Sequence, residues 1–207
     1  MIYAENILLC IAIPFIIAAV FSRGHTRRFI ISFLAGMVSC LIAAYISGFI
    51  DAVKCVDETA LFISPIIEEI MKMLPLVFYL FMFEPEDNAL VMTAIGIGTG
   101  FATYENCCYI LTMGAEKISY VIIRGMAVGV MHIVSIIAFI IGLTIARRFK
   151  LLSVASIVGA LSLSMTFHGL YNLLVSEPGI TTYIGYALPI VAALLLYIPY
   201  RRGEKSI

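Results

Sequence analysis

The sequence predicts an all-α protein that crosses a lipid bilayer about seven times. Of its 207 residues, 62% are hydrophobic and only 13% are charged, and the mean hydropathy is +1.08. Soluble domains are closer to a quarter charged and less than half apolar, and a chain of this length has too little interior to bury such an excess. We therefore expect residues 1–207 to form a single integral-membrane domain, surrounded by membrane lipid.

A helix needs ~20 apolar residues to cross the hydrocarbon core of a bilayer, and several runs of the sequence meet this length. The expected helices occupy residues 2–22, 29–50, 60–83, 89–113, 121–146, 151–175 and 182–200. The first run contains Glu5 and has no basic residue before it. It therefore differs from a signal peptide, and we expect it to be retained.

Polar residues and glycines mark where these helices begin, end and meet. The second run ends at the polar segment 51–59, and the third is followed by the acidic segment 84–88. Ser64 and Pro65 are typical of a helix N-cap and first turn, so the third helix should begin inside its apolar run. In the fourth run, glycines at positions 96, 98 and 100 should let another helix come close.

The basic residues predict the orientation in the membrane. Three clusters follow the first, fifth and seventh runs: Arg23, Arg27 and Arg28; Arg147, Arg148 and Lys150; Arg201, Arg202 and Lys205. An odd number of spans places all three on one side, which the positive-inside rule identifies as the cytoplasm. The opposite side keeps Lys54, Lys117 and Arg124. We therefore expect the N-terminus outside and the C-terminus in the cytoplasm.

Several function classes lack support in the sequence. The formal net charge is zero and no long basic run occurs, so we expect no nucleic-acid partner. Neither a P-loop nor a dinucleotide-binding glycine motif is present, so we expect no nucleotide. The five cysteines form no CxxC pair, and all except Cys55 lie in apolar runs, which argues against a disulfide framework.

A small set of polar residues lies inside the predicted helices. They are Glu68, Glu69 and Lys72 in the third, Glu105 and Asn106 in the fourth, His132 in the fifth, and His168 and Asn172 in the sixth. A charged side chain at the centre of a bilayer costs a few kcal/mol on insertion scales. Ionisable residues in such positions mark functional sites by default.

These residues lie at similar depths. Counted from the outer ends of their helices, Glu68 and Glu105 are ~8 residues deep, His132 ~11 and His168 ~7, which is roughly 10–17 Å at 1.5 Å per residue. Four antiparallel helices thus bring polar side chains to one layer in the outer half of the membrane. Lys72 follows Glu68 by four residues and Glu69 by three, so it can neutralise either.

This set of side chains suits hydrolysis by either of two routes. Carboxylates and imidazoles can hold a catalytic zinc while a spare glutamate acts as base. Without a metal, a glutamate and a histidine can deprotonate water while His168 and Asn172 donate to the developing oxyanion. No contiguous zinc motif separates the two routes. Buried Glu, His and Lys residues also build proton relays and transporters, and a non-catalytic scaffold for single-pass helices is a further alternative.

Four motifs occur in a familiar order: Glu68-Glu69-x-x-Lys72, Phe101-x-x-x-Glu105-Asn106, the His132 helix, and His168-Gly-Leu-Tyr-Asn172. Over about residues 60–176 this pattern resembles the PrsW family of intramembrane proteases, relatives of the CAAX prenyl proteases and bacteriocin-processing enzymes. The resemblance implies a multi-pass protein of the bacterial cytoplasmic membrane. It also implies site-1 cleavage of a single-pass anti-sigma factor near its extracytoplasmic side. Processing of a lipidated or bacteriocin peptide is the alternative within this superfamily.

The resemblance also implies roles for individual residues. Glu68 and Glu69 match the essential acidic pair, with Glu68 activating water, and His168 with Asn172 matches the motif proposed to form the oxyanion hole. Glu105 stands where the CAAX proteases place a histidine, and Lys72 and Asn106 are supporting residues. His132, His168 and Glu105 are the expected ligands if a zinc ion is used, and the resemblance leaves metal-free catalysis open.

Overall fold

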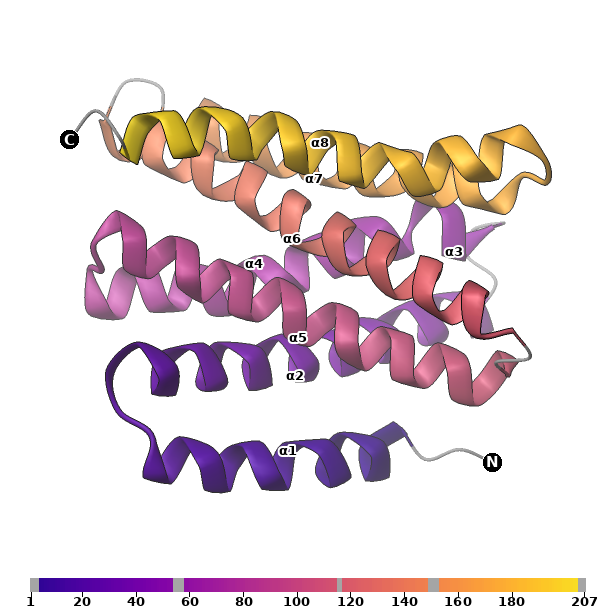
Figure 1. The fold of residues 1–207 in the computed structure, drawn as a ribbon, viewed down its shortest axis with the longest axis horizontal. Helices are drawn as coiled ribbons and strands as arrows, with labels where there is room; N and C mark the ends of the chain where they lie inside the picture. The colour runs from indigo at the N-terminus through magenta and orange to yellow at the C-terminus, as the bar shows by residue number, and fades with distance from the viewer. Residues whose placement is uncertain (1–3, 54–57, 115–116, 149–152, 205–207) are drawn as a thin grey trace.

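The computed structural model describes residues 4–53, 58–114, 117–148 and 153–204, and every regular element in these ranges is a helix (Figure 1). In chain order the helices are α1 (Ala4–Phe21), α2 (Gly24–Ala52), α3 (Thr59–Phe62), α4 (Ser64–Phe83), α5 (Asp87–Met113), α6 (Ile118–Arg148), α7 (Ser153–Ser176) and α8 (Ile180–Glu204). Lys54, Cys55, Lys150 and Lys205 lie outside the described residues.

Five of these helices are long and apolar enough to cross a membrane: α1, α2, α6, α7 and α8. The predicted all-α, multi-pass membrane protein is therefore confirmed. Helix α5 covers the expected range 89–113, whereas the expected range 60–83 is divided between α3 and α4. Helix α4 carries Glu68, Glu69 and Lys72 within its 20 residues, and α5 contains several glycine, threonine and asparagine residues. A total of about seven crossings and the orientation of the termini stay predictions.

The start of α4 differs from the prediction by one residue. We expected Ser64 to cap the helix, but the N-cap is Ile63 and no side chain makes a capping hydrogen bond. Helix α3 ends directly before it, and Ile63 keeps a right-handed helical backbone whose carbonyl accepts a hydrogen bond from the Ile67 N–H at 3.1 Å. A capping side chain needs a non-helical residue, and none intervenes here. Pro65 lies in the first turn, as predicted.

The long helices run side by side, so their connections gather at two ends (Figure 1). The connections α1–α2 and α4–α5 lie at one end, together with the C-terminal part of α8. We call this the arginine end, because Arg23, Arg27 and Arg28 lie there. Helix α3, the start of α6 and the α7–α8 connection lie at the opposite end. The antiparallel order assumed for the depth estimate is therefore present.

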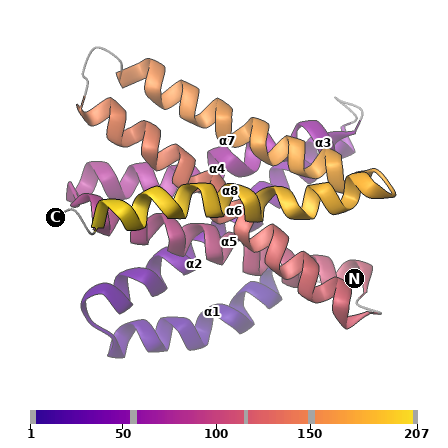
Figure 2. The ribbon, with the colours of Figure 1, turned by 45° about the horizontal axis from the view of Figure 1, so that its top comes forward.

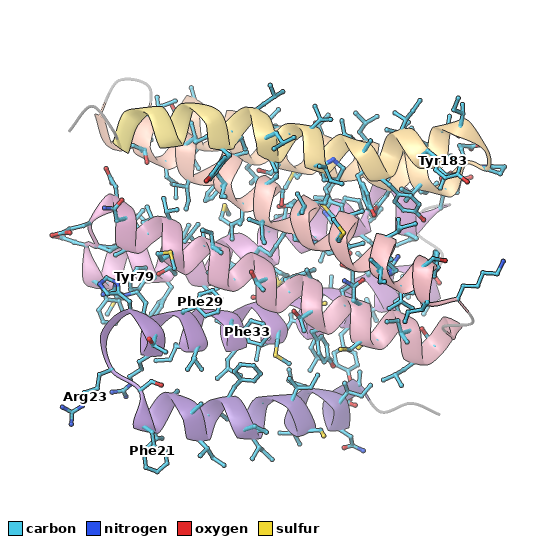
Figure 3. The ribbon with its side chains drawn as sticks, viewed as in Figure 1. Phe21, Arg23, Phe29, Phe33, Tyr79 and Tyr183 are labelled. Atoms are coloured by element: carbon cyan, nitrogen blue, oxygen red, sulfur yellow. The ribbon has the colours of Figure 1, made fainter. Side chains whose placement is uncertain are left out.

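Helices α1 and α8 lie on opposite sides of the bundle (Figure 1 and Figure 2). Apolar side chains on both helices are exposed: Phe21 on α1 points away from the other helices in Figure 3 and is 84% exposed, and Tyr183 on α8 is 72% exposed. Exposed apolar side chains on such helices are suited to contact with lipid tails. The interior of the bundle is therefore built mainly by the other long helices.

The glycines of α5 allow two other helices to approach its backbone. A Cβ atom added at Gly100 would lie 1.9 Å from the carbonyl oxygen of Phe33 on α2, and one at Gly98 would lie 3.1 Å from the carbonyl oxygen of His132 on α6. The close approach predicted from the glycine spacing is confirmed. Through Gly98, the packing of α6 on α5 also places His132 within reach of the polar residues on α4 and α5.

Candidate active site

Lys72 on α4 is the centre of a buried polar cluster. Its ammonium group donates to Glu69 Oε1 at 2.6 Å and Ser135 Oγ at 2.9 Å, and His132 Nδ1 lies 3.0 Å from it. A lysine ammonium has three donors, and all three are used here. Of the two glutamates that sequence spacing offered to Lys72, the structure selects Glu69. The pairing leaves Glu68 without this cation.

His132 links Lys72 to Glu105. Because Nδ1 accepts from Lys72, the hydrogen-bond network assigns the proton of the neutral ring to Nε2, which donates to Glu105 Oε2 at 2.5 Å. The other oxygen of Glu105 accepts from Arg124 Nη2 at 3.1 Å. Arg124 in turn lies 3.5 Å from the centre of the Tyr109 ring, which is a cation–π contact. Glu105 is thus held from both sides.

His168 on α7 connects the two adjacent glutamates. Its Nδ1 lies 2.8 Å from Glu69 Oε1, so the ring donates there and leaves a lone pair on Nε2. This Nε2 faces Glu68 Oε2 at 3.6 Å, and that oxygen is buried with no hydrogen-bond partner in the described part of the chain. Two acceptor atoms that face each other in this way require a proton, a water molecule or a cation between them.

The structure tests whether these residues fit a metal ion. Glu68, His132 and His168 each offer one ligand atom, and the three atoms lie within 4.8 Å of one another. Within the cluster three carboxylates face only two permanent cations, Lys72 and Arg124, so Glu68 has an unbalanced charge. Glu69 also fixes the ring of His168 from behind, as outer carboxylates do for metal-binding histidines. Glu68 and His168 therefore offer free acceptor atoms that suit a divalent transition metal, and His132 can join them only by giving up its contact with Lys72 or with Glu105.

The group differs in one member from the ligands that the sequence suggested. We expected His132, His168 and Glu105, whereas the close group contains Glu68 in place of Glu105. Glu105 is bonded instead to His132 and Arg124.

The two asparagines differ in their surroundings. Asn106 is half-buried, and its Oδ1 is buried without a hydrogen-bond partner among the described residues. Asn172 lies one helical turn after His168 and is half-buried, and in the described ranges it makes no hydrogen bond with the cluster. The assignment of Asn172 to an oxyanion hole therefore stays a prediction.

Sequence reasoning missed three residues of this cluster. Ser135 accepts from Lys72, Ser164 on α7 donates to the Ser135 carbonyl oxygen at 2.7 Å, and Arg124 binds Glu105. Ser135 lies three residues after His132, so helical spacing could have identified it. The partner of Arg124 depends on the register of α6 against α5, for which the sequence carries no direct signal.

The cluster is closed on one side and partly open on the other. The side chains of Glu69 and Lys72 are 3% and 1% exposed, whereas those of Glu68 and Glu105 are 18% and 29% exposed. A molecule that reaches the cluster therefore meets Glu68 and Glu105 first. The arrangement can hold a cation or a water molecule beside an unpaired carboxylate, with fixed imidazoles around it.

Residues 24–198 match a family model described as PrsW family intramembrane metalloprotease. This range includes every residue of the cluster. No curated protein and no solved structure matches the chain.

Proposed function

The chain belongs to the PrsW family of intramembrane metalloproteases, and from this premise we propose that it cuts a single-pass membrane protein near its extracytoplasmic side. The observation that carries the proposal is the unpaired Oε2 of Glu68, which faces Nε2 of His168 at 3.6 Å. We further propose an anti-sigma factor as the substrate, site-1 cleavage as the step, and the bacterial cytoplasmic membrane as the location.

We propose that Glu68 and His168 hold the metal, with zinc as the ion, and that His132 becomes the third ligand when one of its ring nitrogens leaves Lys72 or Glu105. Zinc accepts carboxylate and imidazole ligands in catalytic sites and keeps one position open. When bound, such an ion supplies Lewis acidity, which activates water and polarises a peptide carbonyl. Glu68 has two carboxylate oxygens, so it can serve as a ligand with one and accept a proton with the other.

Residues of the chain carry out the proton transfers and hold the histidine rings in position. Glu68 accepts the proton of the attacking water as general base. Glu69 keeps the ring of His168 in place, and the ring of His132 is kept in place by whichever of its contacts with Lys72 and Glu105 remains. Glu68 then passes the proton from water to the leaving amine, and Glu105, which receives the His132 Nε2–H at 2.5 Å, orients the His132 ring.

The amides complete the proposed site. Asn172 donates to the developing oxyanion, for which His168 has no N–H left, and Asn106 supports Glu105 from the next position of α5. The peptide bond must first leave its helix, because a helical carbonyl in lipid is already hydrogen-bonded. The partly exposed side of the cluster, with Glu68 and Glu105, is where we propose that the unwound segment enters.

The test compares new N-termini of membrane proteins in cells that express the wild type or Glu68→Gln at equal levels. We expect a single-pass protein to be cut near its outer boundary only in wild-type cells. Glu177→Gln is the matched control, because Glu177 is exposed in the α7–α8 connection, and it should cut normally. Identical cleavage in wild type and Glu68→Gln under several envelope stresses would contradict the proposal. Proton flux in liposomes would then be measured for the relay alternative.

A further inference from the structure

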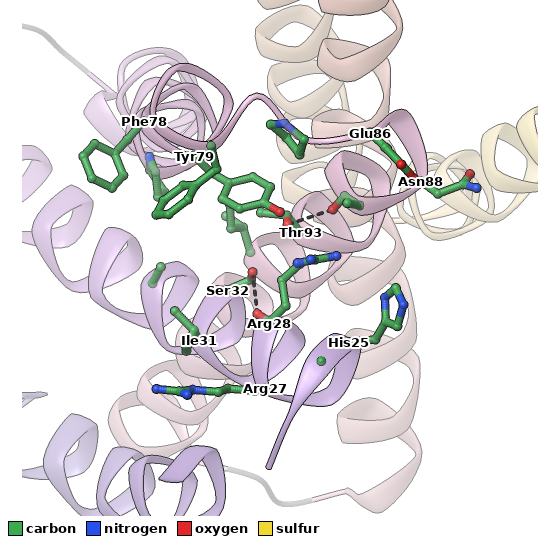
Figure 4. Close-up of a pocket in the computed structure, with 17 residues that line it drawn as sticks. His25, Arg27, Arg28, Ile31, Ser32, Phe78, Tyr79, Glu86, Asn88 and Thr93 are labelled. Carbon is green, nitrogen blue, oxygen red and sulfur yellow. Dashed lines mark hydrogen bonds between the residues drawn. The ribbon is translucent and has the colours of Figure 1, made fainter.

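A cavity of about 960 Å³ lies at the arginine end, between α2, α4 and α5 (Figure 4). It shares no lining residue with the polar cluster. Its walls are largely apolar, with Ala35, Pro75 and Phe78 among the lining residues. Its rim carries cationic side chains from the first turns of α2, namely Arg27 and Arg28. The cavity therefore combines an apolar interior with a basic entrance.

Arg28 is the residue of this rim that most needs a partner. It is half-buried, and in Figure 4 its side chain extends towards Tyr79 and Thr93, whereas Arg27 runs in a different direction. Within the described ranges its guanidinium forms neither a hydrogen bond nor an ion pair, although its carbonyl accepts from Ser32 Oγ at 2.8 Å. A partly buried charge is costly unless an opposite charge compensates it. An anion in the cavity would provide that compensation.

The position of the cavity points to the source of the anion. Helix α2 begins at Gly24 and α4 ends at Phe83, so the rim stands where the helices of this membrane protein reach their ends, at the level of lipid headgroups. Basic pockets between membrane helices on the cytoplasmic side bind anionic headgroups. The predicted orientation places the arginine end on that side. Guanidinium groups bind phosphate in a bidentate manner.

We propose that this cavity binds one anionic phospholipid, with its phosphate at Arg28, the positive charge of Arg27 nearby on the rim, and an acyl chain along Phe78 and Pro75. The volume lies within the range of pockets that enclose small ligands. Glu86 also lines the cavity, but two arginines outnumber it, which favours an anionic headgroup over a zwitterionic one. The site is independent of the proposed proteolytic chemistry, since none of its residues belongs to the polar cluster.

The experiment counts lipids bound to the full-length protein by native mass spectrometry during titration with phosphatidylglycerol. We expect one tightly bound lipid on the wild type and about fivefold weaker binding to Arg28→Gln, because one basic residue near an anionic lipid surface contributes about this factor. Arg23→Gln is the matched control: Arg23 is an exposed arginine at the same end that does not line the cavity. It should bind like the wild type. Phosphatidylcholine with the same acyl chains should bind less tightly and should not respond to Arg28→Gln.

Several outcomes would overturn the proposal. Equal binding of the two lipids, or an equal loss in Arg23→Gln and Arg28→Gln, would mean ordinary lipid contact at the protein surface. If Arg28→Gln fails to fold, Ala35→Leu fills the apolar part of the cavity with the arginines intact, and it should also weaken binding. Unchanged phosphatidylglycerol binding in Ala35→Leu would then refute the site, as would a co-purified polypeptide that fills the cavity while no lipid is bound.

Discussion

Helices α4 and α5 contribute to both the polar cluster and the cavity at the arginine end. The two regions differ in whether their basic side chains form ion pairs within the protein. In the cluster, α6 and α7 close around α4 and α5, and Lys72 and Arg124 each find a carboxylate within the chain. At the cavity, α2 is the third described helix of the wall, and its Arg28 lines a space of about 960 Å³ without a carboxylate partner among the described residues. A charge in a membrane protein can thus be compensated from within, or it can indicate a group that comes from outside.

The largest expected effect concerns catalysis in the cluster. His168→Ala should lower kcat for the cleaved substrate by about 10²–10⁴-fold, because it removes both the Nε2 that faces Glu68 and the donor to Glu69. Cleavage is measured in reconstituted vesicles with the substrate identified from new N-termini. Thr166→Ala, at an exposed position of the same helix, should keep full activity. Full activity in His168→Ala would show that the cluster is structural.

The second prediction tests whether the buried ion pair between Lys72 and Glu69 stabilises the protein. Lys72→Met should lower the free energy of unfolding by about 3–5 kcal/mol, because it leaves the buried Glu69 carboxylate without its cation. Thermal unfolding in detergent measures the change. Adding Glu69→Gln to Lys72→Met should recover much of the loss. Equal stability of Lys72→Met and wild type would mean that the pair does not hold the cluster together.

A third prediction separates the two ligand sets. Glu68→Gln should weaken zinc binding by about 10–100-fold or more, because outer-shell changes alone cost this much. Glu105→Gln should fall at the lower end of that range, since Glu105 contacts His132 but lies outside the close group. Bound zinc is measured by elemental mass spectrometry of dialysed protein. A larger loss in Glu105→Gln would favour the ligands first suggested by the sequence.

The smallest expected effects concern the space for an added side-chain atom. The prediction compares the tight contact between α5 and α2 at Gly100 with the cavity at Ala35. Gly100→Ala should destabilise the protein by about 1–3 kcal/mol, because the added methyl group meets the Phe33 carbonyl at 1.9 Å. Ala35→Val adds atoms inside the cavity and should change stability by less than about 0.5 kcal/mol. Both are measured by thermal unfolding in detergent. Equal losses in the two variants would mean that the cavity is closed in the folded protein.

Much of this comparison could be predicted from the sequence. The apolar runs set the helix ranges because lipid allows the backbone to satisfy its hydrogen bonds only within a helix or a closed barrel. Counting residues along each helix placed Glu68, Glu105, His132 and His168 at one depth, and the structure brings these four side chains into one cluster. Depth follows from a fixed rise per residue, so it needs no knowledge of neighbouring helices.

The tertiary structure alone decided which groups pair. Spacing offered Lys72 both glutamates, and the rotation of α4 towards α6 and α7 selected Glu69. The sequence placed Arg124 among the outer basic residues, and the register of α6 on α5 brought it to Glu105. The sequence carries no signal for the cavity beside Arg28. Position along a chain determines depth and approximate helix face, whereas hydrogen bonds and cavities depend on helix rotation and separation to within a fraction of an ångström.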